Sequence, residues 1–372
     1  MKLRTRRGWL GLLLVCMVLP CLAGAAVAQG TTAGYEYFSV GDVAAKTPGK
    51  TSPGLLLMGG GREIDQAFKW FAAQAGHGHI VILRASGDEA LQKYIYRDIG
   101  GVASVQTLIF HARASASDPR VLATVKRADG IFIAGGDQAN YVRFWKGTPL
   151  NALINAHVRA GKPLGGTSAG LAILGQWGYG AMDGGSITSP EALRDPAGSA
   201  VTLVDHFVSL KLLRGIIIDT HFAQRDRLGR LLAFVARVAR DHHTAAVTGL
   251  GVDQDSALLV EANGDARLLS WHADGHAWIV VPEKLREVGR KAPDAYLKER
   301  VAAGKSLDLD GYVVTGVGTT SRLHLPDCAV ENAAFVRHID VVDGRLVEHA
   351  GPRMRGGYAS RASLIGADVA QP

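Results

Sequence analysis

Cysteine is scarce in this sequence, with three residues among 372. Cys16 and Cys21 belong to an N-terminal segment that we expect to be removed, which leaves Cys328 alone. A single thiol cannot close an internal disulfide even in an oxidising compartment, so the stability of the fold must come from its hydrophobic core. A lone cysteine can be a catalytic nucleophile. The neighbours of Cys328, Asp327 and Ala329, do not form the sharp turn that presents a nucleophile, so we expect a buried thiol there.

Runs of lysine and arginine are absent beyond the first residues, and internal repeats and low-complexity tracts are absent throughout. The full chain has a formal net charge of +7. Four positive charges, on Lys2, Arg4, Arg6 and Arg7, lie within the first 28 residues, so removal of that segment leaves +3. The basic composition therefore gives no support to nucleic-acid binding, and we expect no nucleic-acid partner.

The first 28 residues have the order of a secretory signal peptide: basic residues, an apolar stretch over 9–22, and small residues up to Ala28. A membrane anchor is the competing interpretation, since no charge lies between Arg7 and Glu36. Pro20 and the small residues favour cleavage after Ala28. The arginine pair is also a weak twin-arginine export signal. We expect a periplasmic or secreted protein with no stable membrane span after cleavage.

The chain beyond the signal alternates between apolar, strand-like runs and amphipathic segments. The expected strands lie at 55–58, 80–83, 105–110, 131–134, 163–165 and 215–219, and the expected helices at 63–74, 88–98, 119–128, 139–145 and 150–160. This alternation predicts βαβ units, and hence an α/β fold in which a mostly parallel sheet is covered on both faces, a three-layer sandwich. Sites in such folds form at the carboxyl ends of the strands.

The domain organisation expected from this pattern has three parts. Residues 1–28 are the signal peptide, residues 29–281 form one α/β domain, and residues 282–372 are a C-terminal extension packed on that domain or appended to it. Within these parts we expect short alternating strands over 245–281, a helix over 284–302, a strand over 333–342 and a tail over 351–372.

The segment Gly166-Thr167-Ser168-Ala169-Gly170 follows an apolar approach and resembles a nucleophile elbow. In such an elbow the chain turns sharply from strand to helix and presents the serine oxygen outward. Small flanking residues relieve the crowding around the strained backbone. Glycine-rich turns of this kind also bind phosphates or simply close a tight loop, so the motif alone leaves these alternatives open.

A serine nucleophile needs a base and a second group that orients the base. His221 is the best candidate base, because it lies just past the strand expected over 215–219, where it could face an elbow at the end of a neighbouring strand. Asp183 is our candidate acid, since it falls between the serine and the histidine in the chain and two glycines follow it. Glu191 is the rival, and an ordinary turn residue is the competing interpretation of Asp183.

Acyl transfer also needs hydrogen-bond donors aimed at the developing oxyanion. Gly136 follows the strand expected over 131–134, and glycine there would let its N–H approach a substrate closely. The second donor would be the N–H of Ala169, directly after the serine. A tight turn before a helix is the competing interpretation of Gly136.

Four motifs occur in a fixed order. They are Gly59-Gly60-Gly61, Gly135-Gly136-Asp137-Gln138, Gly166-Thr167-Ser168-Ala169-Gly170, and Asp219-Thr220-His221-Phe222 followed by Arg225, Arg227, Gly229 and Arg230. In order and spacing they resemble the cyanophycinase and dipeptidase E family of serine peptidases, over about Gly54 to Val260. The resemblance implies a fold like that of class I glutamine amidotransferases, Ser168 as nucleophile, His221 as base, and no metal or organic cofactor.

Cyanophycinases cleave the aspartate-arginine polymer cyanophycin into β-aspartyl-arginine dipeptides, so the resemblance implies a polymer substrate of this kind. Arg225, Arg227 and Arg230 would suit substrate carboxylates, because guanidinium groups bind them bidentately. A solvated helix face is the competing interpretation of these arginines. We add Gln138 and Asp219 to the expected substrate-binding residues.

The sequence is compatible with two other functions. The first is an exopeptidase for α-aspartyl dipeptides, which would need a closed pocket for a free amino terminus. The second is a binding protein on an amidotransferase-like fold that has lost catalysis, although the presence of both Ser168 and His221 argues against it. The sequence also leaves a homodimer open.

Overall fold

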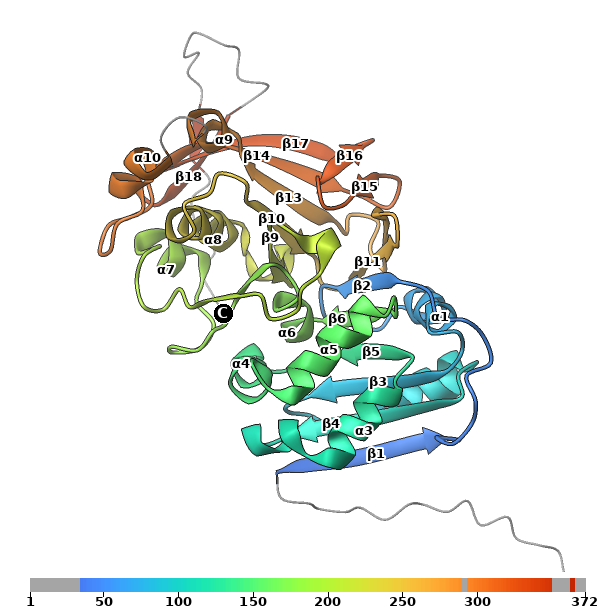
Figure 1. The fold of residues 1–372 in the computed structure, drawn as a ribbon. Coiled ribbons are helices and arrows are strands. Elements are labelled where there is room, and N and C mark those ends of the chain that lie inside the picture. The colour runs from blue at the N-terminus through green and yellow to red at the C-terminus, as the bar shows by residue number, and fades with distance from the viewer. Residues whose placement is uncertain (1–33, 290–292, 350–361, 365–372) are drawn as a thin grey trace, which may run out of the picture.

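The computed structural model describes residues 34–289, 293–349 and 362–364 (Figure 1). The expected signal peptide lies outside these residues, as does most of the expected tail over 351–372. Within the described part, helices alternate with strands that form a ten-stranded and a nine-stranded sheet, which confirms the predicted α/β class. Across the described ranges, none of the helices combines the length and the apolar character that a membrane crossing needs.

The parallel part of the ten-stranded sheet comes from the predicted βαβ series. Its strands are β2 (Gly54–Met58), β3 (His79–Arg84), β4 (Ser104–Phe110), β5 (Gly130–Ile133) and β6 (Leu164–Thr167). Their order in the sheet is β4-β3-β5-β6-β2, and every neighbouring pair is parallel. A strand that the sequence did not predict, β1 (Tyr35–Gly41), closes one edge antiparallel to β4.

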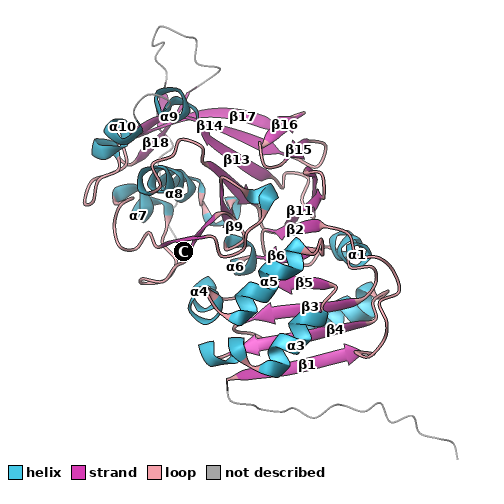
Figure 2. Cartoon of the chain, viewed as in Figure 1, coloured by secondary structure: helices cyan, strands magenta, loops and turns pink. Residues whose placement is uncertain are grey.

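Helices cover both faces of this parallel part, because its strands are apolar on both sides. One face is covered by α3 (Pro119–Arg127), α4 (Gln138–Trp145) and α5 (Pro149–Arg159), and the other by α1 (Asp65–Gln74), α2 (Ala90–Lys93) and the π-helix η1 (Tyr94–Ile99). Figure 2 shows α3 and α5 crossing in front of the strands. Local signals set the helix starts: the Asp118 side chain accepts from Arg120 N at 2.8 Å ahead of Pro119, and Thr148 caps α5.

Beyond β2 the ten-stranded sheet continues in antiparallel pairing. The added strands are β11 (Ser256–Glu261), β12 (Asp265–Ser270), β15 (Arg322–His324) and β16 (Ala329–Glu331). The last two come from the C-terminal extension, so residues beyond 282 complete this sheet.

The nine-stranded sheet was not predicted and is mostly antiparallel. Its strands are β7 (Trp177–Tyr179), β8 (Leu203–Asp205), β9 (Ile216–Thr220), β10 (Thr248–Val252), β13 (Ala277–Pro282), β14 (Leu309–Val317), β17 (Phe335–Val342), β18 (Arg345–His349) and β19 (Ala362–Leu364). Strand β9 runs parallel to β7 and β10, whereas the other pairings are antiparallel. Strand β14 pairs with β13 over six positions, so the extension continues this sheet directly.

The remaining helices pack mainly on the nine-stranded sheet. They are α6 (Ala169–Ala172), α7 (Ser189–Arg194), α8 (Leu228–Asp241), α9 (Glu283–Gly289) and α10 (Pro293–Arg300), with the 3-10 turns η3 (Lys211–Leu213) and η4 (Ala223–Arg225). The 3-10 turn η2 (Arg113–Ser117) instead packs against α3, α4 and α5 beside the parallel strands. The helix expected over 284–302 is thus two helices. Helix α8 buries almost its whole length in a core shared with α7, α9 and α10, while α6 lies between β6 and β9, where the two sheets meet (Figure 1).

Candidate active site

The serine motif forms a sharp turn between β6 and α6. Ser168 has φ 52° and ψ −120°, a strained conformation for a residue with a side chain. The turn requires glycine on both sides: a Cβ on Gly166 would lie 2.7 Å from the Gly170 carbonyl oxygen, and one on Gly170 would collide with the carbonyl of Ile133. The spacing of the motif is therefore explained by close backbone approaches, and the turn has the geometry of a nucleophile elbow.

The structure brings Ser168 and His221 together. The Ser168 Oγ lies 2.7 Å from Nε2 of His221, a residue that directly follows β9. The end of β2 holds both residues: Ser168 N donates to Met58 O at 3.1 Å, and His221, which follows β9 of the other sheet, donates from N to Gly59 O at 2.8 Å. A Cβ on Gly60 would collide with the imidazole ring, so the glycine triplet after β2 provides the space in which the ring lies.

The partner of the other imidazole nitrogen is an amide. Nδ1 of His221 lies 2.9 Å from Oε1 of Gln254, which belongs to the turn between β10 and β11 where the chain crosses from one sheet to the other. A carbonyl oxygen only accepts, so Nδ1 carries the proton and Nε2 presents its lone pair to the serine hydroxyl. Gln254 therefore fixes the tautomer that a general base needs, without adding a negative charge.

Neither acid expected from the sequence reaches the histidine. Asp183 lies in an exposed loop between β7 and α7. The Glu191 side chain turns back on its own helix, where it accepts from Thr188 N at 2.7 Å and completes a capping box. The glycine-rich loop that was expected to carry Asp183 inward instead leaves it in solvent.

The surroundings of His221 favour its neutral form. Burial lowers the pKa of the imidazole below its ordinary value of 6.5, the hydrogen bond with Gln254 opposes this shift, and the positive charges of Arg225 and Arg227 lower the pKa further. A neutral imidazole can accept a proton from serine at pH 7. The activity of such a pair is lost as the pH falls through the pKa of the histidine, which here lies below 6.5.

Replacing Gln254 with glutamate is expected to move the acidic limb of the kcat/KM profile to higher pH by about one unit or more, because an adjacent carboxylate stabilises the imidazolium. The pH dependence of ester hydrolysis measures this shift. Gln254→Leu is the matched control, since it removes the acceptor without adding charge: it should lower kcat without raising the midpoint of the acidic limb. An unchanged midpoint in Gln254→Glu would contradict the assigned contact.

A cavity of about 440 Å³ opens beside Ser168. Gly136 and Ala169 both line it, and neither of their N–H groups donates to another residue in the described part of the chain. Gln138 also lines the cavity, at the start of α4. The two expected oxyanion donors thus lie on the same cavity as the serine oxygen, with their N–H groups available to a substrate.

The lining of this cavity is cationic. Arg225 and Arg227 line it as expected, and so does Arg143 of α4, which no sequence motif singled out. Arg143 Nη2 donates to Met182 O at 2.8 Å, which ties α4 to the loop that bounds the cavity. The acidic lining residue Asp137 accepts from Ala139 N as the cap of α4. The cavity therefore suits a substrate that carries carboxylates.

Arg230 and Asp219 lie behind the cavity and do not line it. Both are 2 % exposed, and Asp219 accepts from Arg230 through two bonds, from Nε at 2.7 Å and from Nη2 at 2.6 Å. Arg227 Nη1 approaches the same carboxylate at 3.3 Å. This buried cluster holds Arg227 at the cavity wall, so these two residues, expected to bind substrate, instead position one that lines the cavity.

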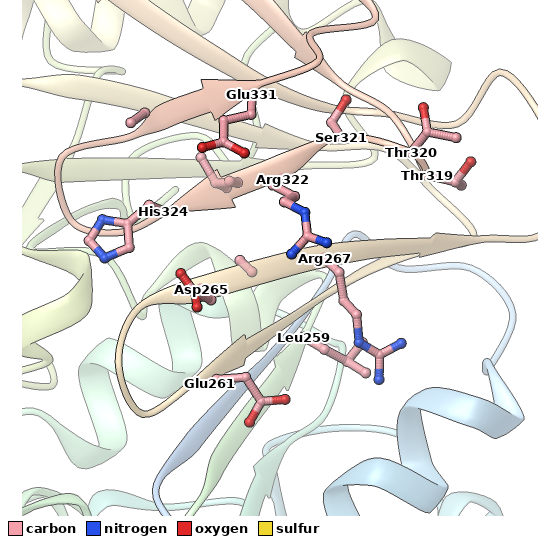
Figure 3. Close-up of a pocket in the computed structure, with 13 residues that line it drawn as sticks. Leu259, Glu261, Asp265, Arg267, Thr319, Thr320, Ser321, Arg322, His324 and Glu331 are labelled. Atoms are coloured by element: carbon pink, nitrogen blue, oxygen red, sulfur yellow. The ribbon is translucent and has the colours of Figure 1, made fainter.

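A larger hollow of about 600 Å³ lies on strands β11, β12, β15 and β16 of the ten-stranded sheet (Figure 3), and its lining shares no residue with the cavity beside Ser168. Charged side chains of both signs line it, among them Glu261, Arg267, Arg322 and Glu331. Its lining includes no nucleophile paired with a base among the described residues. Cys328 is buried as predicted, and burial raises the pKa of its thiol to about 12, so it is not a rival nucleophile.

The comparisons with known proteins agree on one family. The model of peptidase family S51 matches residues 55–268. A cyanophycinase from Synechococcus elongatus is 36 % identical over 176 residues, which make up 47 % of this chain and 49 % of that protein. A cyanophycinase from Trichormus variabilis is 31 % identical over 252 residues, 64 % of this chain and 77 % of that protein. The chain thus spans about half the length of the first of these relatives.

A solved structure, a peptidase from an acI-B1 Actinobacterium, superposes with a TM-score of 0.44 at 16 % identity. The superposition covers 62 % of this chain and 91 % of that one.

Proposed function

Because the chain belongs to peptidase family S51, we propose that it is a serine peptidase in which Ser168 attacks the carbonyl carbon of a peptide or isopeptide bond. The observation that carries this proposal is the 2.7 Å contact between Ser168 Oγ and His221 Nε2 within an elbow. His221 takes the hydroxyl proton as the serine bonds to carbon, and later gives it to the leaving amine. Water then hydrolyses the acyl-enzyme by the same route. The N–H groups of Gly136 and Ala169 stabilise the oxyanion.

The substrate we propose is an aspartate-arginine polymer of the cyanophycin type, cleaved to β-aspartyl-arginine dipeptides. Two features support it: the relatives that match most of this chain's central part are cyanophycinases, and the cavity beside Ser168 is lined by Arg143, Arg225 and Arg227. Guanidinium groups bind carboxylates through paired hydrogen bonds, which suits a substrate rich in aspartate.

We also propose that the enzyme is exported and acts in the periplasm or outside the cell. The support is the signal-like order of residues 1–28: basic residues, an apolar stretch and small residues up to Ala28. Cell fractionation of the full-length protein, with cleavage after Ala28 read from the mass of the exported form, tests this proposal. Retention in the cytoplasm would contradict it.

Mass spectrometry of the products released from cyanophycin tests the substrate. The wild-type protein is expected to release β-aspartyl-arginine, and Ser168→Ala is expected to release none. Labelling of the wild type by a fluorophosphonate probe, absent in Ser168→Ala, shows independently that the serine is reactive. Labelling without release from the polymer would overturn the substrate and keep the peptidase; hydrolysis of short α-aspartyl peptides alone would then identify an exopeptidase. No labelling and no release would overturn the peptidase itself.

A further inference from the structure

The edge of the ten-stranded sheet that carries Ser168 continues past the catalytic pair. Strands follow one another in the order β5-β6-β2-β11-β12. Thr167 at the end of β6 pairs with Met58 at the end of β2, and Met58 pairs with Ala257 near the start of the antiparallel β11. Ser256 in turn pairs with Ser270, the last residue of β12. The residue after β12 therefore lies on the same edge as Ser168.

That residue is Trp271, a large apolar side chain that is 54 % exposed. Its position is fixed by three contacts: Trp271 N donates to Asp255 O at 3.0 Å, Trp271 Nε1 donates to Glu63 O at 3.0 Å, and the guanidinium of Arg62 lies 5.0 Å from the ring centroid. Arg62 is paired in turn with the Asp255 carboxylate at 3.4 Å. An exposed indole held this firmly is a rigid platform on the surface of the protein.

The platform is joined to the catalytic histidine through adjacent residues. Asp255 follows Gln254, whose side chain accepts from His221, and Asp255 N donates to the carbonyl of Gly60, which packs against the imidazole. Three strand spacings separate β6 from β12, which places Trp271 roughly 14 Å from Ser168 along the edge. An extended substrate chain covers that length with about four residues.

We propose that Trp271 forms a subsite that stacks a guanidinium-bearing side chain of the substrate, on the far side of Ser168 from the arginine-lined cavity. This inference rests on the proposed peptidase function. An exposed indole face attracts a cation, and Arg62 already stacks on this ring. Asp255 balances the charge of Arg62, and the exposed acids Glu63, whose carbonyl accepts from the indole, and Asp274, three residues along the chain, supply the negative charge that favours a further cation. The site thus offers arginines to carboxylates on one side and an aromatic ring to a cation on the other.

Kinetics on substrates of two lengths test the subsite. With a long aspartate-arginine oligomer, Trp271→Ala is expected to raise KM roughly three- to tenfold and to leave kcat unchanged. With a single blocked dipeptide unit, both constants should stay unchanged, since such a substrate does not reach the ring. Trp271→Phe keeps an aromatic ring but loses the Nε1 hydrogen bond, so its KM for the oligomer should stay close to that of the wild type. Val336→Ala, 55 % exposed on the other sheet, is the matched control.

Binding of the oligomer to Ser168→Ala, measured by calorimetry with and without Trp271→Ala, separates the subsite from the proposed function. Trp271-dependent binding together with an inactive wild type would overturn the peptidase and retain the subsite. Hydrolysis of long and short substrates with the same KM ratio in Trp271→Ala as in the wild type would overturn the subsite and retain the peptidase. No measurable binding of the oligomer would also overturn the subsite.

Discussion

Replacing His221 with alanine is expected to lower kcat by roughly 10⁶-fold, the order of the loss when a serine peptidase loses its general base. The reason lies in the geometry: Nε2 of His221 is 2.7 Å from the serine oxygen, and Gln254 holds the ring in the tautomer that can accept the proton. KM should change little, because the imidazole contributes to proton transfer rather than to substrate affinity. Steady-state kinetics on an activated ester and on the polymer give both constants.

His243→Ala is the matched control for this loss. His243 is exposed and pairs with Asp294 on the surface, so its removal should leave kcat within about twofold of the wild type. The rate of labelling of Ser168 by a fluorophosphonate should fall in His221→Ala and stay unchanged in the control. Activity of His221→Ala within tenfold of the wild type would show that a different group takes the serine proton.

The sequence predicted the parts of the site that depend on strand ends. Ser168 and His221 are each framed by a local motif directly after an apolar strand, and parallel strands bring their carboxyl ends to one edge. The 2.7 Å contact found between these two residues agrees with that expectation. The glycines of these motifs are also local signals, because close backbone or side-chain neighbours at Gly60 and Gly170 leave no room for a Cβ.

The partner of the histidine could not be predicted by the same argument. Gln254 reaches His221 because the chain crosses from β10 in one sheet to β11 in the other, and no pattern along the chain indicated two sheets. The order of residues along the chain, with Asp183 between Ser168 and His221, pointed to Asp183 instead. The glycine-rich loop that carries Asp183 can follow many backbone paths, so its position could not be predicted. One signal was present in the sequence: residues 249–255 form an apolar strand followed directly by polar residues. Because the carboxyl ends of parallel strands meet at one edge of a sheet, these polar residues are expected near His221.

The second sheet was missed for a related physical reason. Its strands β13, β14, β17 and β18 pair antiparallel, and their partners are set by contacts between distant segments rather than by local apolar runs. Parallel βαβ units, in contrast, leave a regular alternation that is visible in the sequence. The C-terminal extension was therefore expected to be packed on the domain or appended to it, whereas its strands continue both sheets.

Replacing Asp219 with alanine is expected to lower the free energy of unfolding by about 3–5 kcal/mol, because it leaves two buried guanidinium groups without their shared carboxylate. Asp219 accepts two hydrogen bonds from Arg230 and lies 3.3 Å from Arg227 Nη1. Burial already lowers the pKa of Arg227 to about 10, which shows how strongly this environment disfavours an unpaired charge. Urea unfolding followed by circular dichroism measures the loss.

Asp241→Ala is the matched control, since Asp241 pairs with Arg237 and Arg240 on the surface of α8 and its side chain is 30 % exposed. An exposed pair of this kind contributes less than about 1 kcal/mol, so the two variants should differ severalfold in their cost. Asp219→Asn keeps the shape and the acceptor oxygen, and should lie between them. If Asp219→Ala cost no more than the control, water or other acceptors would be satisfying Arg227 and Arg230. The cluster would then not be what holds Arg227 at the wall of the cavity.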